Sequence, residues 1–259
     1  MSDDVLVAVS DGVGTVTLNR PERLNTLAIP TVGRLVEALG EVAAADAVRV
    51  VVLAGAGRVF CAGADQAEMV ERAPHEWEPI VRCYLDPIRA IVGMDKPVIA
   101  ALQGDAVGGG LGLALACDFR IAADGIRMGA PFTPIGLAGC DMSAGWFLPR
   151  LVGLGTATEL MFTGRLVEAA EAREIGLVHR TADPAAFPGE VEALAAQLAA
   201  GPPIAQRWTK RAIHHSLGVD MASEFEFEIF AQVQCIQSDD HREGVRAFRE
   251  KRLPVFRGQ

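Results

Sequence analysis

Aromatic and basic residues are both scarce in this chain. Aromatic residues make up 6% of its 259 residues, and 24 lysines and arginines are outnumbered by 33 acidic residues, which gives a net charge of −9. Nucleic-acid-binding proteins need a basic surface, so this acidic balance excludes nucleic acid as a partner. The beginning of the chain, Met1-Ser2-Asp3-Asp4, lacks the basic and apolar regions of a signal peptide.

Long hydrophobic runs and paired cysteines are missing as well. The longest apolar run, Pro97–Cys117, is broken by Gln103, Asp105 and five glycines, so we expect no membrane-spanning helix. The five cysteines are odd in number and form no C-x-x-C pair, which is typical of reduced thiols in a cytoplasmic protein. No histidine has metal-ligand spacing with another histidine, cysteine or carboxylate, and we predict no metal site.

Strand and helix patterns alternate along most of the chain, which predicts an α/β fold with a largely parallel sheet. The expected strands are a hairpin of Val5–Val9 and Val13–Leu18, followed by Val48–Ala54, Pro97–Leu102 and Phe119–Ala122. A first helix is expected over Ile29–Ala45, and later helices over 155–163, 167–175, 187–200, 203–217, 220–236 and 239–249. We therefore expect an α/β core over residues 1–195 and a helical module over residues 196–259.

A glycine triplet, Gly108-Gly109-Gly110, opens an apolar helix directly after a predicted strand. Glycines let the backbone approach a ligand closely, and the first N–H groups of a helix are unpaired at its positive pole. A second turn, Phe60–Asp65, offers a further N–H. Two such donors suit a developing negative charge, for example on a carbonyl oxygen.

Four segments in order resemble the enoyl-CoA hydratase/isomerase (crotonase) superfamily over essentially the whole chain. They are Leu18–Asn25, Val59–Asp65, Ala106–Ala114 and Glu243–Arg252. The resemblance implies the crotonase (ClpP-like) fold of repeated ββα units, with a C-terminal helical trimerisation module and assembly as a homotrimer or a dimer of trimers. It also implies an acyl-CoA thioester substrate, of which coenzyme A is itself a part, and no separate cofactor.

The same resemblance implies the site residues. The backbone N–H groups of Ala64 and Gly109 would hold the thioester oxygen. Coenzyme A would be bound by Arg23 and Leu24 near the adenine, by Ala62 and Asp65 around the first turn, and by Phe248 and Lys251 from a C-terminal helix.

This chain departs from the family's hydratases at both of their acids. Gly112 and Phe132 stand where those enzymes carry glutamates, and neither can transfer a proton. Asp141 occupies a position at which several isomerases of the family, and a dehalogenase, carry a working aspartate. It could instead cap a helix over Met142–Leu151. Asp105, just before the glycine triplet, is a reserve candidate near the acyl pocket or a turn cap.

We therefore expect an enolate-stabilised double-bond isomerase with Asp141 as acid and base, and an apolar acyl pocket that includes Phe132. Two alternatives stay open. One is a weak enoyl-CoA hydratase that directs water with Asp141 or Asp105. The other is a catalytically silent CoA-ester-binding subunit, which the missing acids favour. Glu68 and Glu71 are interpreted as a solvated face, and His75 would act only if its segment covered the pocket.

Overall fold

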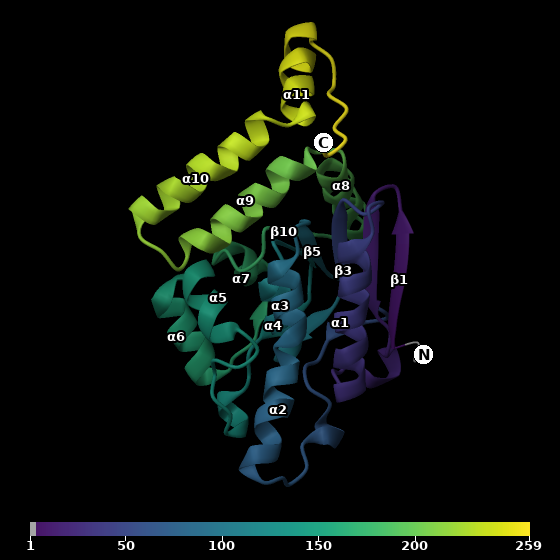
Figure 1. Cartoon of the computed structure of the whole chain (residues 1–259). Helices are drawn as coiled ribbons and strands as arrows, with labels where there is room; N and C mark the ends of the chain where they lie inside the picture. The colour runs from purple at the N-terminus through teal and green to yellow at the C-terminus, as the bar shows by residue number, and fades with distance from the viewer. Residues whose placement is uncertain (1–3) are drawn as a thin grey trace.

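Two sheets form the centre of the molecule in the computed structural model, which describes residues 4–259 (Figure 1). The larger sheet has the strand order β1-β2-β3-β5-β7-β10 and the smaller one β4-β6-β8-β9. The antiparallel hairpin of β1 (Val5–Ser10) and β2 (Val13–Leu18) is present as predicted, and the other pairings of the larger sheet are parallel. The expected α/β class is confirmed.

From β3 to β8 consecutive strands alternate between the two sheets, which is how the repeated ββα units arise. Each unit places its first strand in the larger sheet and its second in the smaller one, and helices follow. The pairs are β3 (Val50–Gly55) with β4 (Val59–Cys61), β5 (Val98–Leu102) with β6 (Asp105–Val107), and β7 (Phe119–Ala123) with β8 (Arg127–Gly129). The short strands β9 (Val167–Glu168) and β10 (Arg180–Ala182) complete the sheets.

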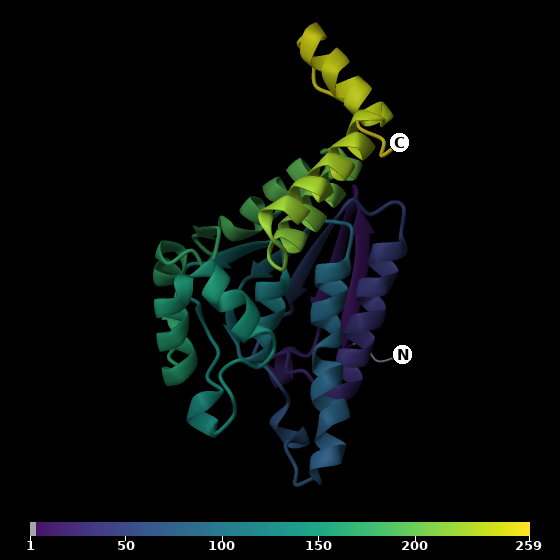
Figure 2. The same ribbon diagram turned by 60° about the vertical axis from the view of Figure 1, so that its left-hand side comes forward.

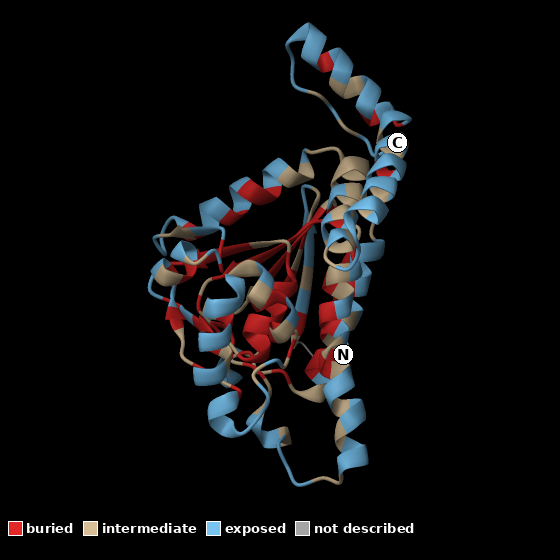
Figure 3. Ribbon diagram, turned by 90° about the vertical axis from the view of Figure 1, so that its left-hand side faces the viewer, coloured by how far each residue is buried: buried red, intermediate tan, exposed pale blue. Residues whose placement is uncertain are grey.

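Helices cover the sheets, and α4 (Gly109–Ala116) lies in the middle with all eight of its residues buried (Figure 3). Its composition explains this position, because it consists only of glycine, alanine and leucine and has no polar face to expose. The other helices up to the C-terminal region are α1 (Ile29–Ala44), α2 (Pro74–Tyr84), α3 (Asp86–Gly93), α5 (Ala144–Leu151), α6 (Gly153–Thr163) and α7 (Ala169–Glu174).

The C-terminal helices lie progressively farther from the core along the chain. Helix α8 (Phe187–Ala199) contacts the larger sheet, α9 (Pro203–Ser216) and α10 (Met221–Ile236) pack as a hairpin, and α11 (Asp239–Glu250) projects away from the rest (Figures 1 and 2). Lys210 fastens α9 to the core through Asp118 (2.8 Å) and the Ile91 carbonyl (2.9 Å). The division into domains near residue 195 stays a prediction.

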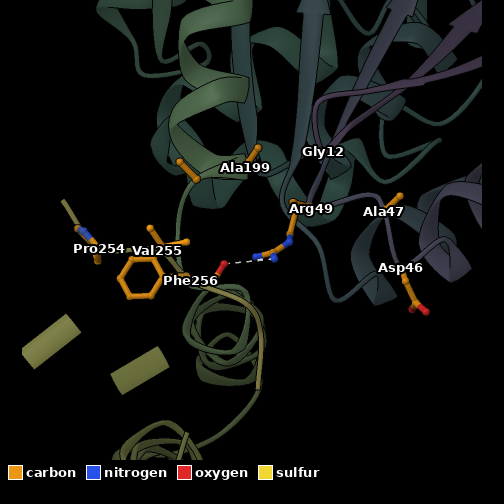
Figure 4. Close-up of a pocket in the computed structure, with 9 residues that line it drawn as sticks. Gly12, Asp46, Ala47, Arg49, Ala199, Pro254, Val255 and Phe256 are labelled. Atoms are coloured by element: carbon orange, nitrogen blue, oxygen red, sulfur yellow. Dashed lines mark hydrogen bonds between the residues drawn. The ribbon is translucent and has the colours of Figure 1, made fainter. Parts of the chain in front are cut away.

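A surface hollow of about 460 Å³ lies where the chain's last residues meet the core (Figure 4). Arg49 Nη2 donates a hydrogen bond to the Phe256 carbonyl there (3.3 Å), while Asp46 points away from that contact. With one polar link and no converging charges, the hollow is a seam between the C-terminal tail and the core. In the part of the chain that the structure describes, no helix is both long enough and apolar enough to cross a membrane.

Candidate active site

The two predicted turns lie directly against each other. Gly63 has a φ of +94°, which favours glycine, and a Cβ atom built on it would stand 3.2 Å from the Gly109 nitrogen and 3.0 Å from the Val107 carbonyl oxygen. Any side chain at Gly63 would therefore push the turns apart. The structure thus brings the Phe60–Asp65 turn and the glycine triplet together.

The N–H groups of Ala64 and Gly109 both lack an internal acceptor among the described residues. Around Ala64 the chain bridges to Leu27, with Leu27 N donating to the Gly63 carbonyl (2.8 Å) and Asp65 N to the Leu27 carbonyl (3.1 Å). Successive N–H groups of an extended chain face opposite sides, so that of Ala64 faces away from Leu27. Gly109 is the first residue of α4, where no carbonyl of the helix is available.

Apolar side chains from three separate segments surround this pair of donors. A Cβ atom on Gly109 would stand 3.2 Å from Leu27 Cδ1 and 3.3 Å from Met142 Cε, and one on Gly108 would stand 3.5 Å from the Phe132 ring. Leu27, Phe132 and Met142 are all buried. In such dry surroundings, hydrogen bonds to a charged oxygen are stronger than they would be in water.

Asn25 holds the loop before the first turn, and sequence reasoning did not single it out. It is buried, has a φ of +53°, accepts a hydrogen bond from Arg20 N (2.8 Å) and donates to the carbonyls of Ala56 (2.9 Å) and Val59 (2.7 Å). Asparagine tolerates this left-handed backbone better than most residues. The sequence offered a signal in this polar residue close to apolar ones, but the two carbonyls to which Asn25 donates lie over 30 residues further along the chain.

Gly112 has no space for a side chain. A Cβ atom there would stand 2.3 Å from the Met142 carbonyl oxygen and 2.7 Å from Met142 Cβ. The position at which the family's hydratases carry one glutamate is thus closed by the backbone of the turn before α5. Met142 and Ser143 both adopt positive φ in that turn, and the Ser143 hydroxyl is buried without a hydrogen-bond partner in the described chain.

Asp141 stands next to Met142 and is half-buried. Its Oδ1 accepts one hydrogen bond, from Met142 N (2.8 Å). The alternative of a cap for a helix beginning at Met142 is wrong, because α5 begins at Ala144 and its N-cap residue is Ser143. The Asp141 carboxylate therefore does not accept hydrogen bonds from the first N–H groups of α5.

Two other carboxylates near the turns are occupied by internal partners. Asp105, at the opposite end of β6 from the glycine triplet, accepts hydrogen bonds from the backbone (2.7 Å) and guanidinium (2.9 Å) of Arg127, and its reserve role at the acyl pocket stays a prediction. Asp65 accepts from Ala67 N, Thr26 and Arg20. The Ala67 N–H, with Thr26 and Arg20, lowers the pKa of Asp65 despite the opposing effect of burial.

The predicted contacts to coenzyme A fall into two separate groups. Leu24 lies beside the first turn, since its carbonyl accepts from Ala62 N (3.1 Å), and Arg23 is exposed nearby. Phe248, 85% exposed, and Lys251 lie on or just after α11, which projects away from the core (Figure 2). Within one chain the two groups do not come together, because α11 does not fold back over the turns, and the coenzyme A contacts stay a prediction.

Glu68 is not on a solvated face, which corrects the sequence interpretation. Its Oε1 accepts from Ile29 N (3.2 Å), and its Oε2 is buried with no partner in the described chain. Glu71 is exposed as expected, and His75 is exposed as well. No cluster of three or more metal-ligating side chains is found among residues 4–259.

Comparisons with known proteins agree over nearly the whole chain. Residues 8–259 match the family model described as enoyl-CoA hydratase/isomerase. The chain is 40% identical to YngF of Bacillus subtilis and 35% identical to the 1,2-epoxyphenylacetyl-CoA isomerase of Escherichia coli, covering 100% of each protein. A crystal structure of an enoyl-CoA hydratase from Bacillus anthracis superimposes with a TM-score of 0.94 at 35% identity, covering 99% of this chain and 100% of that one. The chain belongs to the enoyl-CoA hydratase/isomerase family.

Proposed function

We propose that this protein isomerises a double bond in an acyl-CoA thioester through an enolate. The observation that carries the proposal is the pair of adjacent backbone donors, Ala64 N–H and Gly109 N–H, which have no internal acceptor in the described chain. The thioester oxygen accepts both hydrogen bonds and takes up the negative charge of the enolate. Each such preorganised donor contributes roughly 10²–10³ in rate.

Asp141 is the proposed acid and base. Its carboxylate removes a proton from the carbon next to the thioester carbonyl, and the electron pair of the broken C–H bond moves toward the thioester oxygen to give the enolate. The protonated carboxyl then returns the proton at another carbon of the conjugated system. The double bond has migrated, and no atom is gained or lost.

Isomerisation is favoured over hydration because the site lacks the groups that direct water. The space at Gly112 is filled by the backbone of Met142, and the Phe132 ring lies against Gly108 where the second hydratase acid would serve. Hydration without these carboxylates loses a general acid–base contribution of about 10²–10⁴. The relatives include proteins named as hydratases and the 1,2-epoxyphenylacetyl-CoA isomerase of Escherichia coli, so the family is not confined to hydration.

Coenzyme A is proposed to lie across two copies of the chain. Arg23, Leu24 and Ala62 of one copy bind beside the first turn, while Phe248 and Lys251 come from α11 of another. The C-terminal helices support an assembly, a homotrimer or a dimer of trimers, because large apolar side chains are exposed there. Among them are Met221 (71%), Ile229 (59%) and Ile236 (56%).

Bond migration in a panel of 2-enoyl-, 3-enoyl- and arylacyl-CoA esters tests this function. We expect turnover by the wild type, a loss of about 10²–10⁴ in Asp141→Asn, and a rate close to wild type in Asp105→Asn, since Asp105 pairs with Arg127. Isomerisation that survives in Asp141→Asn would exclude Asp141 as the base.

The panel also separates the alternatives. Robust hydration of crotonyl-CoA by the wild type would establish a hydratase, the activity for which the Bacillus anthracis protein is named. Tight binding of the esters without any turnover would establish a CoA-ester-binding subunit.

A further inference from the structure

The helix that offers Gly109 N–H at one end is held at its other end by a buried arginine. Arg120 is 3% exposed. Its Nη1 donates to the carbonyls of Cys117 (2.7 Å), Ala114 (3.3 Å) and Leu115 (3.5 Å), which belong to the last turn of α4 and its C-cap residue. Its Nε donates to the Leu177 carbonyl (2.8 Å) before β10.

Within the described chain the guanidinium forms no ion pair with a carboxylate, and the nearby Asp118, which acts on its charge, is paired with Lys210. Arg120 takes part in no ion pair among residues 4–259, and its side-chain partners are all backbone carbonyls. The neighbouring His179 accepts a hydrogen bond from Arg120 N through Nδ1 (3.2 Å). Burial and the charge of Arg120 lower the pKa of His179 to about 4, so the imidazole is neutral at pH 7. Arginine remains protonated at ordinary pH, so the positive charge of Arg120 faces the carbonyl groups at the C-terminal end of α4.

The charge of Arg120 at the C-terminal end of α4 also affects the N-terminal end of the same helix. An eight-residue helix is only about 12 Å long, so its negative C-terminal pole weakens the field that its positive N-terminal pole presents to an anion. A cation on the C-terminal carbonyls offsets the negative pole. Because all of α4 is buried, water screens these effects little. Arg120 also fixes the axis of α4, and with it the direction of Gly109 N–H.

We propose that Arg120 is a positioning residue for the thioester oxygen, acting through α4. This role rests on the proposed function, since it presupposes that Gly109 N–H binds that oxygen. Arg120 touches neither the substrate nor the reacting atoms. Its charge, rather than its hydrogen bonds alone, strengthens the polarisation of the thioester carbonyl.

The carbonyl stretch of bound [1-¹³C]crotonyl-CoA measures this polarisation by infrared difference spectroscopy. Arg120→Lys keeps the charge, whereas Arg120→Gln keeps a donor without it. We expect the wild type to lower the stretching frequency on binding, the Lys variant to retain most of that shift and the Gln variant to lose most of it. The kcat of Arg120→Gln should fall about tenfold with KM nearly unchanged. The exposed Arg180, which pairs with Glu190, provides a matched control as Arg180→Gln.

A purely structural arginine gives a different result. Equal carbonyl shifts in the wild type, Lys and Gln variants, with changes only in Tm, would overturn the role of Arg120 and leave the proposed function intact. No shift in the wild type would overturn both. If Arg120→Gln does not fold, the Lys variant can still overturn the proposal, because a lost shift in a folded protein that retains the charge contradicts it.

Discussion

Gly112 and Met142 show at the residue scale why the missing carboxylate is more than a single substitution. A side chain at Gly112 meets the backbone of Met142, and that backbone is held in a turn with two positive φ values. The sequence alone identified Gly112 as a position without an acid. It could not reveal that the backbone of Met142 fills the space beside Gly112. The two residues are about 30 positions apart, and hydrophobic periodicity does not predict the conformation of the turn that joins them.

Gly112→Glu should therefore fail to create a hydratase. The new Cβ atom overlaps the Met142 carbonyl, so we expect a loss of about 1–3 kcal/mol in the free energy of unfolding and no gain in crotonyl-CoA hydration. Urea denaturation and a hydration assay measure the two effects. Gly40→Ala in α1 is the control, because nothing lies within 4 Å of its added Cβ atom. Hydration gained by a fully stable Gly112→Glu would contradict this account.

At the scale of elements, regular patterns were predictable and short strands were not. Helices α9, α10 and α11 lie within one residue of the predicted bounds, because their apolar spacing continues over at least three turns. The strands β4, β6 and β8 have three residues each and depend on pairing with distant segments. Helix α2 was not predicted, since Pro79 lies inside it. The helix expected over 167–175 begins at Ala169, because β9 takes Val167 and Glu168.

His179, just before β10, predicts that the stability of the folded protein depends on pH. The pKa of His179 is about 4 in the native protein, with burial and then Arg120 as its main causes, against about 6.5 in an unfolded chain. As pH falls below about 6.5 the unfolded chain binds a proton that the native state does not, so stability decreases until about pH 4. Urea midpoints at pH 7 and pH 5 should differ less for His179→Asn, which keeps an acceptor without titrating. Identical differences in both proteins would exclude His179 as a source of the slope.

At the scale of the whole molecule, the residues predicted to bind coenzyme A lie in two separate places within one chain. The turns with Ala64 and Gly109 lie in the core, whereas Phe248 and Lys251 belong to a projecting helix and its end. The sequence resemblance predicts that both groups contact coenzyme A, and within one chain they do not come together, so the proposed site needs two copies. The order of motifs along the sequence does not show whether two motifs meet within one chain. A motif can indicate a contact to a ligand without indicating which copy of the chain provides it.

Mixing two inactive variants tests this arrangement. Asp141→Asn removes the proposed base, and Lys251→Glu reverses a charge on the proposed contact to coenzyme A. If α11 serves a neighbouring core, co-refolded mixtures should recover activity, since some sites combine an intact Asp141 with an intact Lys251. Each variant refolded alone is the control. Mixtures no more active than their components would show that each chain builds its site alone.

Deuterium incorporation from D₂O into the carbon next to the thioester tests the central claim most directly, because enolate formation requires that proton to leave. We predict that the wild type exchanges this proton, or moves the double bond with incorporation of solvent deuterium, in at least one enoyl- or arylacyl-CoA ester, and that Asp141→Asn does not. Absence of exchange with esters that bind measurably would contradict enolate chemistry at the Ala64 and Gly109 donors.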